Sequence, residues 1–358
     1  MDTPILDTYS DYLITSFSAI TATGLSTAVD GAISHDQVTR FLSGADYGSR
    51  ELWSKVKKTV REIESDDAVV IFDDTIEEKP FSDESELIAP QYDHCSGTYV
   101  KGINILSCLY HSNNINVPVA IQPIAKTVGY QPGTKVTTGK RQSPITKNEY
   151  YRQMLEVCVF QNHLKFGFVV SDVWYSSVDN MEFVKLKVKK EFVMPIKANR
   201  LIAFSETEKL KGQWQQVGSA NLEAGKEYQV WLKGLSFSVL VTPQIFENKD
   251  GSTGCLYLIC SDLGQKSLKI IDIYRQRWNI EPQYKSVKEN LGLAKSPTQT
   301  ARTQGNHIFV CFYAYFKLEK LKMATKLNHF ALKTKLYLKA IQACMAELLS
   351  IKRQYGIT

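Results

Sequence analysis

Two uninterrupted apolar runs, each followed closely by an aspartate, constrain the fold of this chain more than any other feature. Residues 68–72 are all apolar and precede Asp73, and residues 166–170 contain only apolar residues and one glycine shortly before Asp172. Runs of this length, ending at polar turns, are typical of strands that are buried on both faces of a sheet. Because helical spacing surrounds both runs, the sequence predicts an α/β protein.

The rest of the chain divides into helical and strand-rich segments. Helical spacing marks residues 5–64, 146–162, 178–190, 265–291 and 306–351. Strands are expected at about 99–110 and 117–124, and several more between 191 and 260, where turn residues separate short apolar runs.

The segment 32–42 has the features of a short capped helix. Ser34 can cap it, and Asp36 falls in its first turn. Its apolar face consists of Val38, Phe41 and Leu42, and its polar face carries Gln37, Thr39 and Arg40. This pattern fits the second helix of a helix-turn-helix, with the three polar residues as candidate readers of DNA bases. It fits an ordinary small helical bundle as well.

Positive charge is concentrated near the C-terminal end. The whole chain carries a formal charge of +6, whereas residues 301–358 alone hold ten Lys or Arg and two Glu. Such a basic block indicates a polyanionic partner, although a solvated helix face would have the same composition.

The cysteines and the N-terminus indicate where the protein works. The seven cysteines are scattered without a C-x-x-C pair, which favours free thiols in a reducing compartment, and His94 beside Cys95 is only a weak candidate for a metal site. The chain contains neither a run of about 18 apolar residues nor the basic start of a secretory signal. We therefore expect a cytoplasmic or nucleoid location and no membrane partner.

Asp73 and Asp172 are candidates for one shared site. A carboxylate just past a buried strand costs desolvation free energy unless a partner compensates for it. Neighbouring strands can bring two such carboxylates together, and a divalent cation then offsets their repulsion. The alternative is that each aspartate only turns the chain at the end of its strand.

The stretch 274–288 contributes a third candidate carboxylate. At about 100° per residue, four of its side chains fall within an arc of about 60° on one helical face. These residues are Tyr274, Arg277, Glu281 and Lys288. The carboxylate could complete a metal site beside cations that reach phosphates, or the face could be an exposed amphipathic one. Pro282 removes a backbone donor and tends to kink such a helix.

With these residues the chain resembles the DDE transposases of bacterial insertion sequences, in the IS-four superfamily and its IS-seven-oh-one-like relatives. The four residues of the 274–288 stretch fit every interval of that family's Y-(2)-R-(3)-E-(6)-K signature. Asp73, Asp74 and Thr75 fit its first-acid pattern D-x-[ST], and Asp172 fits its second acid at a strand end. The resemblance covers about residues 65–300.

The resemblance implies an RNase H-like fold, in which a mixed sheet is flanked by helices and a β-rich insertion precedes the catalytic helix. The expected regions are a helical DNA-binding region (1–64), a catalytic core in two parts (65–190 and 261–300), the insertion (191–260) and a basic helical C-terminal region (301–358). An insertion accounts for the 109 residues that separate Asp172 from Glu281, which are too many for one crossover helix.

The implied function is that of a DNA transposase, which cleaves at the ends of an insertion sequence and joins the 3′ ends to target DNA. Asp73, Asp172 and Glu281 would hold two Mg²⁺ ions, for which Mn²⁺ can substitute, in a two-metal-ion phosphoryl transfer. Tyr274, Arg277 and Lys288 would contact the phosphates of the double-stranded DNA. Two protomers would pair on the DNA as a homodimer.

Two alternatives remain open. One is an RNase H-like DNA nuclease or junction-resolving enzyme without strand transfer, and the other is a catalytically inactive DNA-binding relative. A separate choice concerns the adjacent acids Asp73 and Asp74. The D-x-[ST] pattern assigns the metal to Asp73, and because neighbours on a strand point to opposite faces, both cannot easily serve the same ions.

Overall fold

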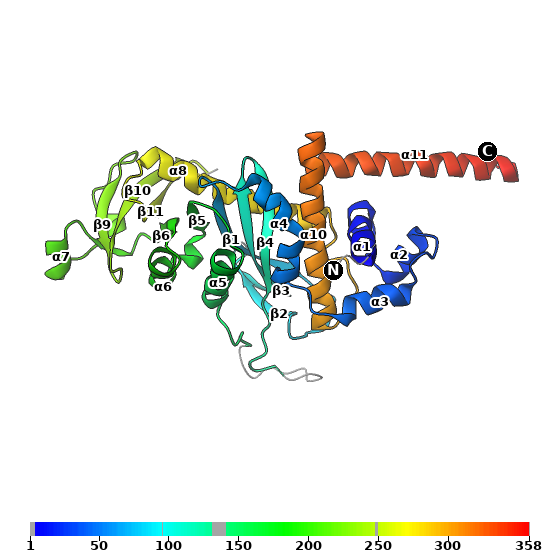
Figure 1. Ribbon diagram of the computed structural model, residues 1–358, viewed down its shortest axis with the longest axis horizontal. Helices are drawn as coiled ribbons and strands as arrows, with labels where there is room; N and C mark the ends of the chain where they lie inside the picture. The colour runs from blue at the N-terminus through cyan, green and yellow to red at the C-terminus, as the bar shows by residue number, and fades with distance from the viewer. Residues whose placement is uncertain (1–3, 95, 131–140, 248–249, 358) are drawn as a thin grey trace.

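The computed structural model describes residues 4–94, 96–130, 141–247 and 250–357, and one sheet forms the part of the molecule away from the N-terminal helices and the C-terminus (Figure 1). The sheet has 11 strands in the order β2-β3-β1-β5-β6-β11-β10-β9-β7-β8, and β4 pairs with β3 beside this path. The strands are β1 (Val69–Glu78), β2 (Ala89–Asp93), β3 (Thr98–Ser112), β4 (Ile115–Pro123), β5 (Phe168–Ser171), β6 (Glu191–Ile196), β7 (Leu201–Ala203), β8 (Gln215–Gln216), β9 (Tyr228–Leu232), β10 (Ser238–Glu247) and β11 (Thr253–Cys260).

Five of these strands form a mixed core. β1, β3 and β4 are antiparallel neighbours, whereas β5 pairs in parallel with β1, and β6 in parallel with β5. The predicted RNase H-like α/β class is thereby confirmed. The two apolar runs form the centre of this core, since residues 69–72 and 169–170 are wholly buried.

The strand-rich segment continues the same sheet. β11 pairs antiparallel with β6, and β10, β9, β7 and β8 follow outward in antiparallel pairs. β6 itself, at 191–196, lies in the parallel part of the core, although the expected insertion begins at residue 191. Parallel pairing of β6 with β5 needs a crossover, which residues 172–190 provide.

Helices cover the sheet and form both ends of the chain. Short 3₁₀ and π segments carry the label η. The elements are α1 (Pro4–Thr15), α2 (Ala22–Ala28), α3 (His35–Gly44), α4 (Ser49–Ile63), α5 (Lys147–Glu156), η1 (Val157–Gln161), η2 (Val173–Tyr175), α6 (Val178–Glu182), η3 (Phe183–Lys187), α7 (Glu206–Leu210), η4 (Val217–Ser219), α8 (Ser267–Arg275), η5 (Gln276–Asn279), α9 (Ile280–Glu289), α10 (Ala301–Thr325) and α11 (His329–Tyr355).

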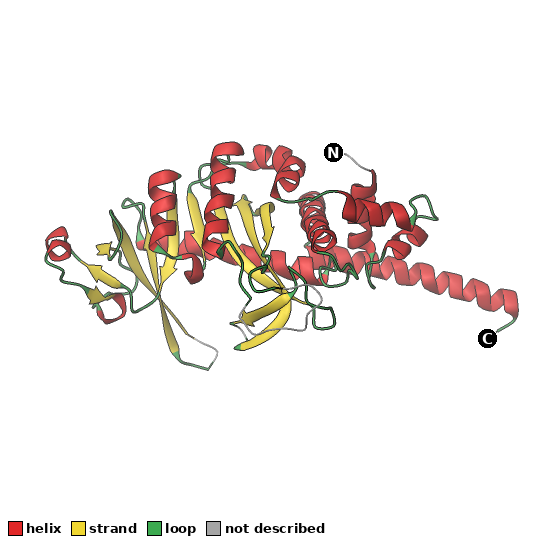
Figure 2. Cartoon of the chain, turned by 90° about the horizontal axis from the view of Figure 1, so that it is seen from below, coloured by secondary structure: helices red, strands yellow, loops and turns green. Residues whose placement is uncertain are grey.

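Helix α10 joins the N-terminal helices to the sheet, and α11 leaves the body of the molecule. α10 packs against α1, α3, α4 and β4 and is buried along most of its length. α11 projects outward to the C-terminus in both views (Figures 1 and 2), and only His329 and Leu332 of it are buried. None of the helices in the described parts of the chain is both long and apolar enough to cross a membrane.

His329, the first residue of α11, connects three helices. Its Nδ1 hydrogen-bonds with Ser286 Oγ of α9 at 2.9 Å, and its Nε2 lies 3.2 Å from Glu319 Oε1 of α10. Lys322 also bonds to the buried Glu319 carboxylate. The start of α11 is therefore fixed to the core even though the rest of the helix is exposed.

Two predicted helices are interrupted in the structure. The expected helix 265–291 is α8, a 3₁₀ turn (η5) and α9, and the interruption at 276–279 lies before Pro282. Pro282 occupies the first turn of α9, where a missing N–H leaves no intrahelical bond unmade. The expected helix 306–351 is α10 and α11, which separate at Lys326, where the backbone is left-handed with φ 61°.

Candidate active site

The parallel pairing of β1 and β5 brings the two strand-end aspartates together. Phe72 of β1 is in register with Ser171 of β5, so Asp73 and Asp172 are the next residues on adjacent strands. β5 ends there, and Asp172 caps η2 by accepting the Val173 N–H at 2.6 Å. Asp73 stays within β1, opposite Ser107 of β3.

The environment of Asp73 disfavours its charged form. Burial, with the nearby charges of Asp74 and Asp172, raises the pKa of this carboxyl to about 7, although Arg277 and the Asp74 N–H act in the opposite direction. A cation near Asp73 stabilises the charged carboxylate, because its attraction offsets the desolvation cost and the repulsion from the neighbouring carboxylates.

Arg277 connects Asp73 with the third candidate carboxylate. From η5, its Nη1 donates to Asp73 Oδ2 at 3.4 Å, and its Nη2 donates to Glu281 Oε1 at 3.1 Å. Its Nε is buried and has no partner. Burial alone would lower the pKa of Arg277, but Tyr274 and the three carboxylates raise it overall. The guanidinium is thus the positive centre of an acidic cluster.

The 274–288 residues come from three successive elements rather than from one helix: η5 and α9 pack against β1, and α8 packs against β5 and β6. Tyr274 of α8 is buried, and its pKa is raised to about 12, mainly by burial. Lys288 of α9 donates from Nζ to the backbone oxygen of Ile76 in β1 at 2.6 Å. Tyr274, Arg277 and Glu281 are thus in contact with one another, whereas the ammonium of Lys288 binds the strand instead of joining them.

Tyr284 is a site residue that the sequence reasoning missed. Its hydroxyl donates to the backbone oxygen of Asp73 at 2.5 Å and also bonds to Ser107 Oγ at 2.8 Å. It fixes the backbone that carries Asp73. Its position, three residues after Glu281 on the same face of α9, was the available signal.

Asp74 points to the opposite face of the sheet from Asp73. Its carboxylate accepts hydrogen bonds from Lys147 Nζ at 3.0 Å, Tyr175 Oη at 2.6 Å and Asn104 Nδ2 at 2.6 Å. These three donors compensate its charge on the side that α5 covers. The contacts give Asp74 a structural role and leave Asp73 beside Asp172.

The donor set has the chemistry that a magnesium site requires, since all three candidate ligands are carboxylates. Asp73 and Asp172 are adjacent, and Glu281 shares Arg277 with Asp73. Across the described ranges, however, no three Asp, Glu, His or Cys side chains are close enough to hold a metal ion as they are placed. Glu281 bonds to Arg277 and does not reach the two aspartates.

The N-terminal candidates lie apart from these carboxylates, on α3, beyond α10 from β1 (Figure 1). Ser34 caps α3, its apolar residues Val38, Phe41 and Leu42 are buried, and Gln37, Thr39 and Arg40 are exposed, as expected. The Gln37 side chain also completes the cap by accepting the Ser34 N–H at 2.8 Å.

Part of the basic C-terminal block is used inside the chain. Lys317 pairs with Asp11, Lys322 with Glu319, and Arg302 with Asp46. Lys333 donates to backbone oxygens at the end of α1. The exposed cations of α11 include Lys335, Lys339 and Arg353.

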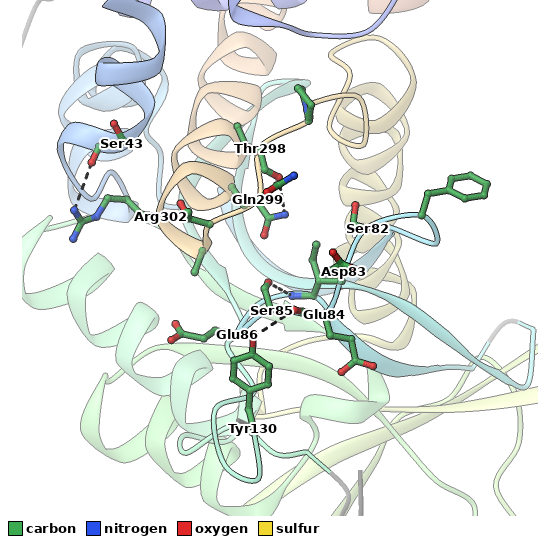
Figure 3. A pocket seen from close by; sticks show the side chains of 16 residues that line it. Ser43, Ser82, Asp83, Glu84, Ser85, Glu86, Tyr130, Thr298, Gln299 and Arg302 are labelled. Atoms are coloured by element: carbon green, nitrogen blue, oxygen red, sulfur yellow. Dashed lines mark hydrogen bonds between the residues drawn. The ribbon is translucent and has the colours of Figure 1, made fainter. Parts of the chain in front are cut away.

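A cavity of about 860 Å³ lies elsewhere, between the loop that follows β1 and the start of α10 (Figure 3). Its acidic side chains are Asp83, Glu84 and Glu86, and Arg302 lies at its edge. None of the three candidate catalytic carboxylates lines it. Its acidic lining makes it a poor place for a DNA backbone.

Two known families match large parts of the chain. Residues 5–225 match the family described as DDE superfamily endonuclease, and residues 138–317 match the family described as transposase DDE domain. The first match includes Asp73 and Asp172, and the second includes Asp172 and Glu281. No curated protein matches the chain.

Proposed function

This chain belongs to the DDE superfamily of endonucleases and transposases, and we propose that it is a transposase that cleaves DNA at the ends of an insertion sequence and joins the 3′ ends to target DNA. One observation carries the proposal. A single guanidinium, that of Arg277, contacts Asp73 and Glu281 beside Asp172. Three carboxylates from distant parts of the chain thus surround one cationic group.

The proposed ligands of two Mg²⁺ ions are Asp73, Asp172 and Glu281. When bound, such ions supply an activated hydroxyl nucleophile and stabilise the leaving oxygen in a displacement at phosphorus. Tyr284 keeps the Asp73 backbone in place, and Arg277 provides a buried positive charge that attracts a phosphate. Tyr274 and Lys288 support the same face of α8 and α9, where DNA phosphates are bound.

Recognition of the element ends is assigned to the N-terminal helical region. Thr39 and Arg40 project from α3 as candidate base readers. Gln37 is the third candidate, although its cap to Ser34 must open before its amide can reach a base. The protein acts on double-stranded DNA in the cytoplasm, at the bacterial nucleoid.

A second copy of the chain is the proposed partner, and α11 is the proposed contact. The exposed residues Leu338, Ile341, Met345, Leu348 and Tyr355 follow one another at intervals of three, four, three and seven. This is the spacing of a coiled-coil seam, which is stable only when another helix covers it. Holding two DNA ends together requires two such protomers.

The test is a cleavage and strand-transfer assay on DNA of the element's own ends with Mg²⁺. We expect Asp73→Asn, Asp172→Asn and Glu281→Gln each to abolish cutting and joining while DNA binding remains. The matched controls are Glu289→Gln on α9 and Asp272→Asn on α8, which remove a charge from exposed positions nearby.

The outcomes separate the candidate functions. A transposase is supported if the wild type and the control variants cut and join DNA and the three carboxylate variants do neither. Cutting without joining identifies a nuclease or junction-resolving enzyme, and binding without cutting identifies an inactive relative. Activity of the Glu281→Gln variant at the level of Glu289→Gln excludes Glu281 from the site.

A further inference from the structure

Four exposed aromatic rings contact one another in a continuous row. The Tyr99 and Tyr92 rings lie 5.3 Å apart, Tyr92 and His94 4.9 Å apart, and His94 and Trp174 5.4 Å apart. The exposed fractions are 63% for Tyr99, 44% for Tyr92 and 49% for Trp174. We call these four residues the aromatic row.

The aromatic row begins just after the end of β5, next to Asp172 in the chain. Trp174 lies in η2, two residues after Asp172. Lys147 Nζ is 5.0 Å from the centre of the Trp174 ring and also bonds to Asp74. From there the row extends to the β2–β3 hairpin, where Tyr92 and Tyr99 are directly paired across the strands.

Packing of the core does not account for the row. Tyr175, the next residue after Trp174, is fully buried and bonds to Asp74, so η2 is anchored without the tryptophan. A cross-strand pair explains why Tyr92 and Tyr99 touch, but it does not explain why the row continues through His94 to a different element. Contiguous exposed aromatic surface of this kind marks a binding site.

We propose that the aromatic row binds unpaired bases of a DNA strand that leaves the active site across the end of β5. This inference rests on the proposed function, because it takes Asp172 to be at the site of DNA cleavage. Flat rings accept stacked bases of any sequence, and stacking on such rings is the usual way in which proteins hold single strands. The Lys147 ammonium lies over the Trp174 ring and pairs with Asp74, which places a positive charge beside the row.

The experiment compares two labelled DNAs in the presence of a chelator, so that no cleavage occurs. One is a blunt duplex, and the other is the same duplex with a single-stranded tail of about ten thymidines, a length within the range of single-strand sites. Fluorescence anisotropy measures the affinity of the full-length protein for each. Wild type is expected to bind the tailed duplex more tightly than the blunt one.

The variants are Trp174→Ala, Trp174→Phe and Tyr99→Ala. We expect Trp174→Ala to lower the affinity for the tailed duplex about tenfold, as loss of one stacking ring does, and to leave the blunt duplex unchanged. Trp174→Phe should restore most of the loss. Tyr99→Ala should act in the same direction, and because Tyr99 is far from η2 along the row, it cannot disturb the turn that Asp172 caps.

The control is Phe81→Ala, since Phe81 is fully exposed outside the row and its removal should change neither affinity. Equal losses on both DNAs, or no loss in Trp174→Ala and Tyr99→Ala, would overturn the inference and leave a protein partner as the occupant of the row. A separate Mg²⁺ cleavage assay keeps the two hypotheses apart. Intact cleavage with no tail effect refutes only the aromatic row, whereas a tail effect without any cleavage refutes only the proposed enzyme.

Discussion

Arg277 and Asp73 are 204 residues apart in the chain, and a salt bridge of 3.4 Å joins them. The same guanidinium also holds Glu281. The side chain of Arg277 is only 11% exposed, and its guanidinium compensates the charge of Asp73 together with the Asp74 N–H, which donates to Asp73 Oδ1 at 2.8 Å. Arg277 therefore decides how the acidic cluster is arranged before DNA arrives.

Replacement of Arg277 by Gln should destabilise the protein without divalent metal. Loss of the guanidinium leaves the buried Asp73 without this cation, and we expect the free energy of unfolding to fall by about 2 kcal/mol, less than for a fully buried pair because Glu281 is half exposed. Urea unfolding measures this. Arg277→Lys keeps the charge but loses the two-pronged contact, so an intermediate value is expected. Equal stability of all three proteins would contradict the assigned role.

Asp73→Asn should change how stability depends on pH. The pKa of Asp73 is about 7 in the folded chain and near 3.8 when unfolded. Between these values the folded state holds a proton that the unfolded state has lost, so stability falls as pH rises from about 4 to 7. At about 1.4 kcal/mol per pH unit, the full effect slightly exceeds about 4 kcal/mol.

The free energies of unfolding of wild type and Asp73→Asn are measured by urea unfolding at pH 5 and pH 8, in the presence of a chelator. The Asn variant should be more stable than wild type by several kcal/mol at pH 8, and the difference should shrink at pH 5. Asp272→Asn, an exposed change on α8, serves as the reference. A difference that is the same at both pH values would show that Asp73 titrates normally.

Lys288→Ala should weaken the attachment of α9 to β1. The variant loses the bond to Ile76 O and a cation that lowers the pKa of the buried Glu77. We expect the free energy of unfolding to fall by about 1.5–3 kcal/mol, the usual range for a charged hydrogen bond. Lys285→Ala on the exposed side of α9 is the comparison, with a change below about 0.5 kcal/mol. If Lys288→Ala lowers the affinity for DNA and leaves the free energy of unfolding unchanged, the ammonium binds DNA phosphates and does not stabilise the fold.

Substitution of Ile341 by Asp should separate the proposed dimer. The change places a charge in the middle of the exposed apolar stripe of α11, whereas Ser350→Asp places one on the opposite side of the same helix. Sedimentation velocity should give a dimer for wild type and Ser350→Asp, and a monomer for Ile341→Asp. A wild-type chain that is monomeric both free and bound to DNA would refute this use of α11.

Much of the core could be predicted from local sequence. In residues 68–72 and 166–170 the side chains that would point to either face of a sheet are apolar, as a central strand requires. The two runs lie mostly in the adjacent strands β1 and β5. β2 escaped notice because Pro90 and alternating exposure are typical of an edge strand, which carries little apolar signal. The membership of β6 in the parallel core depends on its pairing with β5, which no local pattern contains.

The candidate site could be predicted only in part, because it also depends on contacts between distant parts of the chain. The spacing of Tyr274, Arg277 and Glu281 indicates a shared face, but the 3₁₀ turn between α8 and α9 coincides with the contact of Arg277 with Asp73, a residue from another part of the chain. The aromatic row could not be predicted at all, since its members are spread from residue 92 to residue 174 and only folding brings them into contact.

His329 determines how far the C-terminus of this chain can be trimmed. A protein that ends after Thr334 keeps the imidazole between Ser286 and Glu319 and loses the protruding part of α11, together with the contact of the Tyr337 ring with Phe17. A protein that ends before Asn328 deprives α9 of that tether and leaves the buried Glu319 with fewer partners. The protein that ends after Thr334 is thus the one to express when a monomeric, crystallisable form of the catalytic body is wanted.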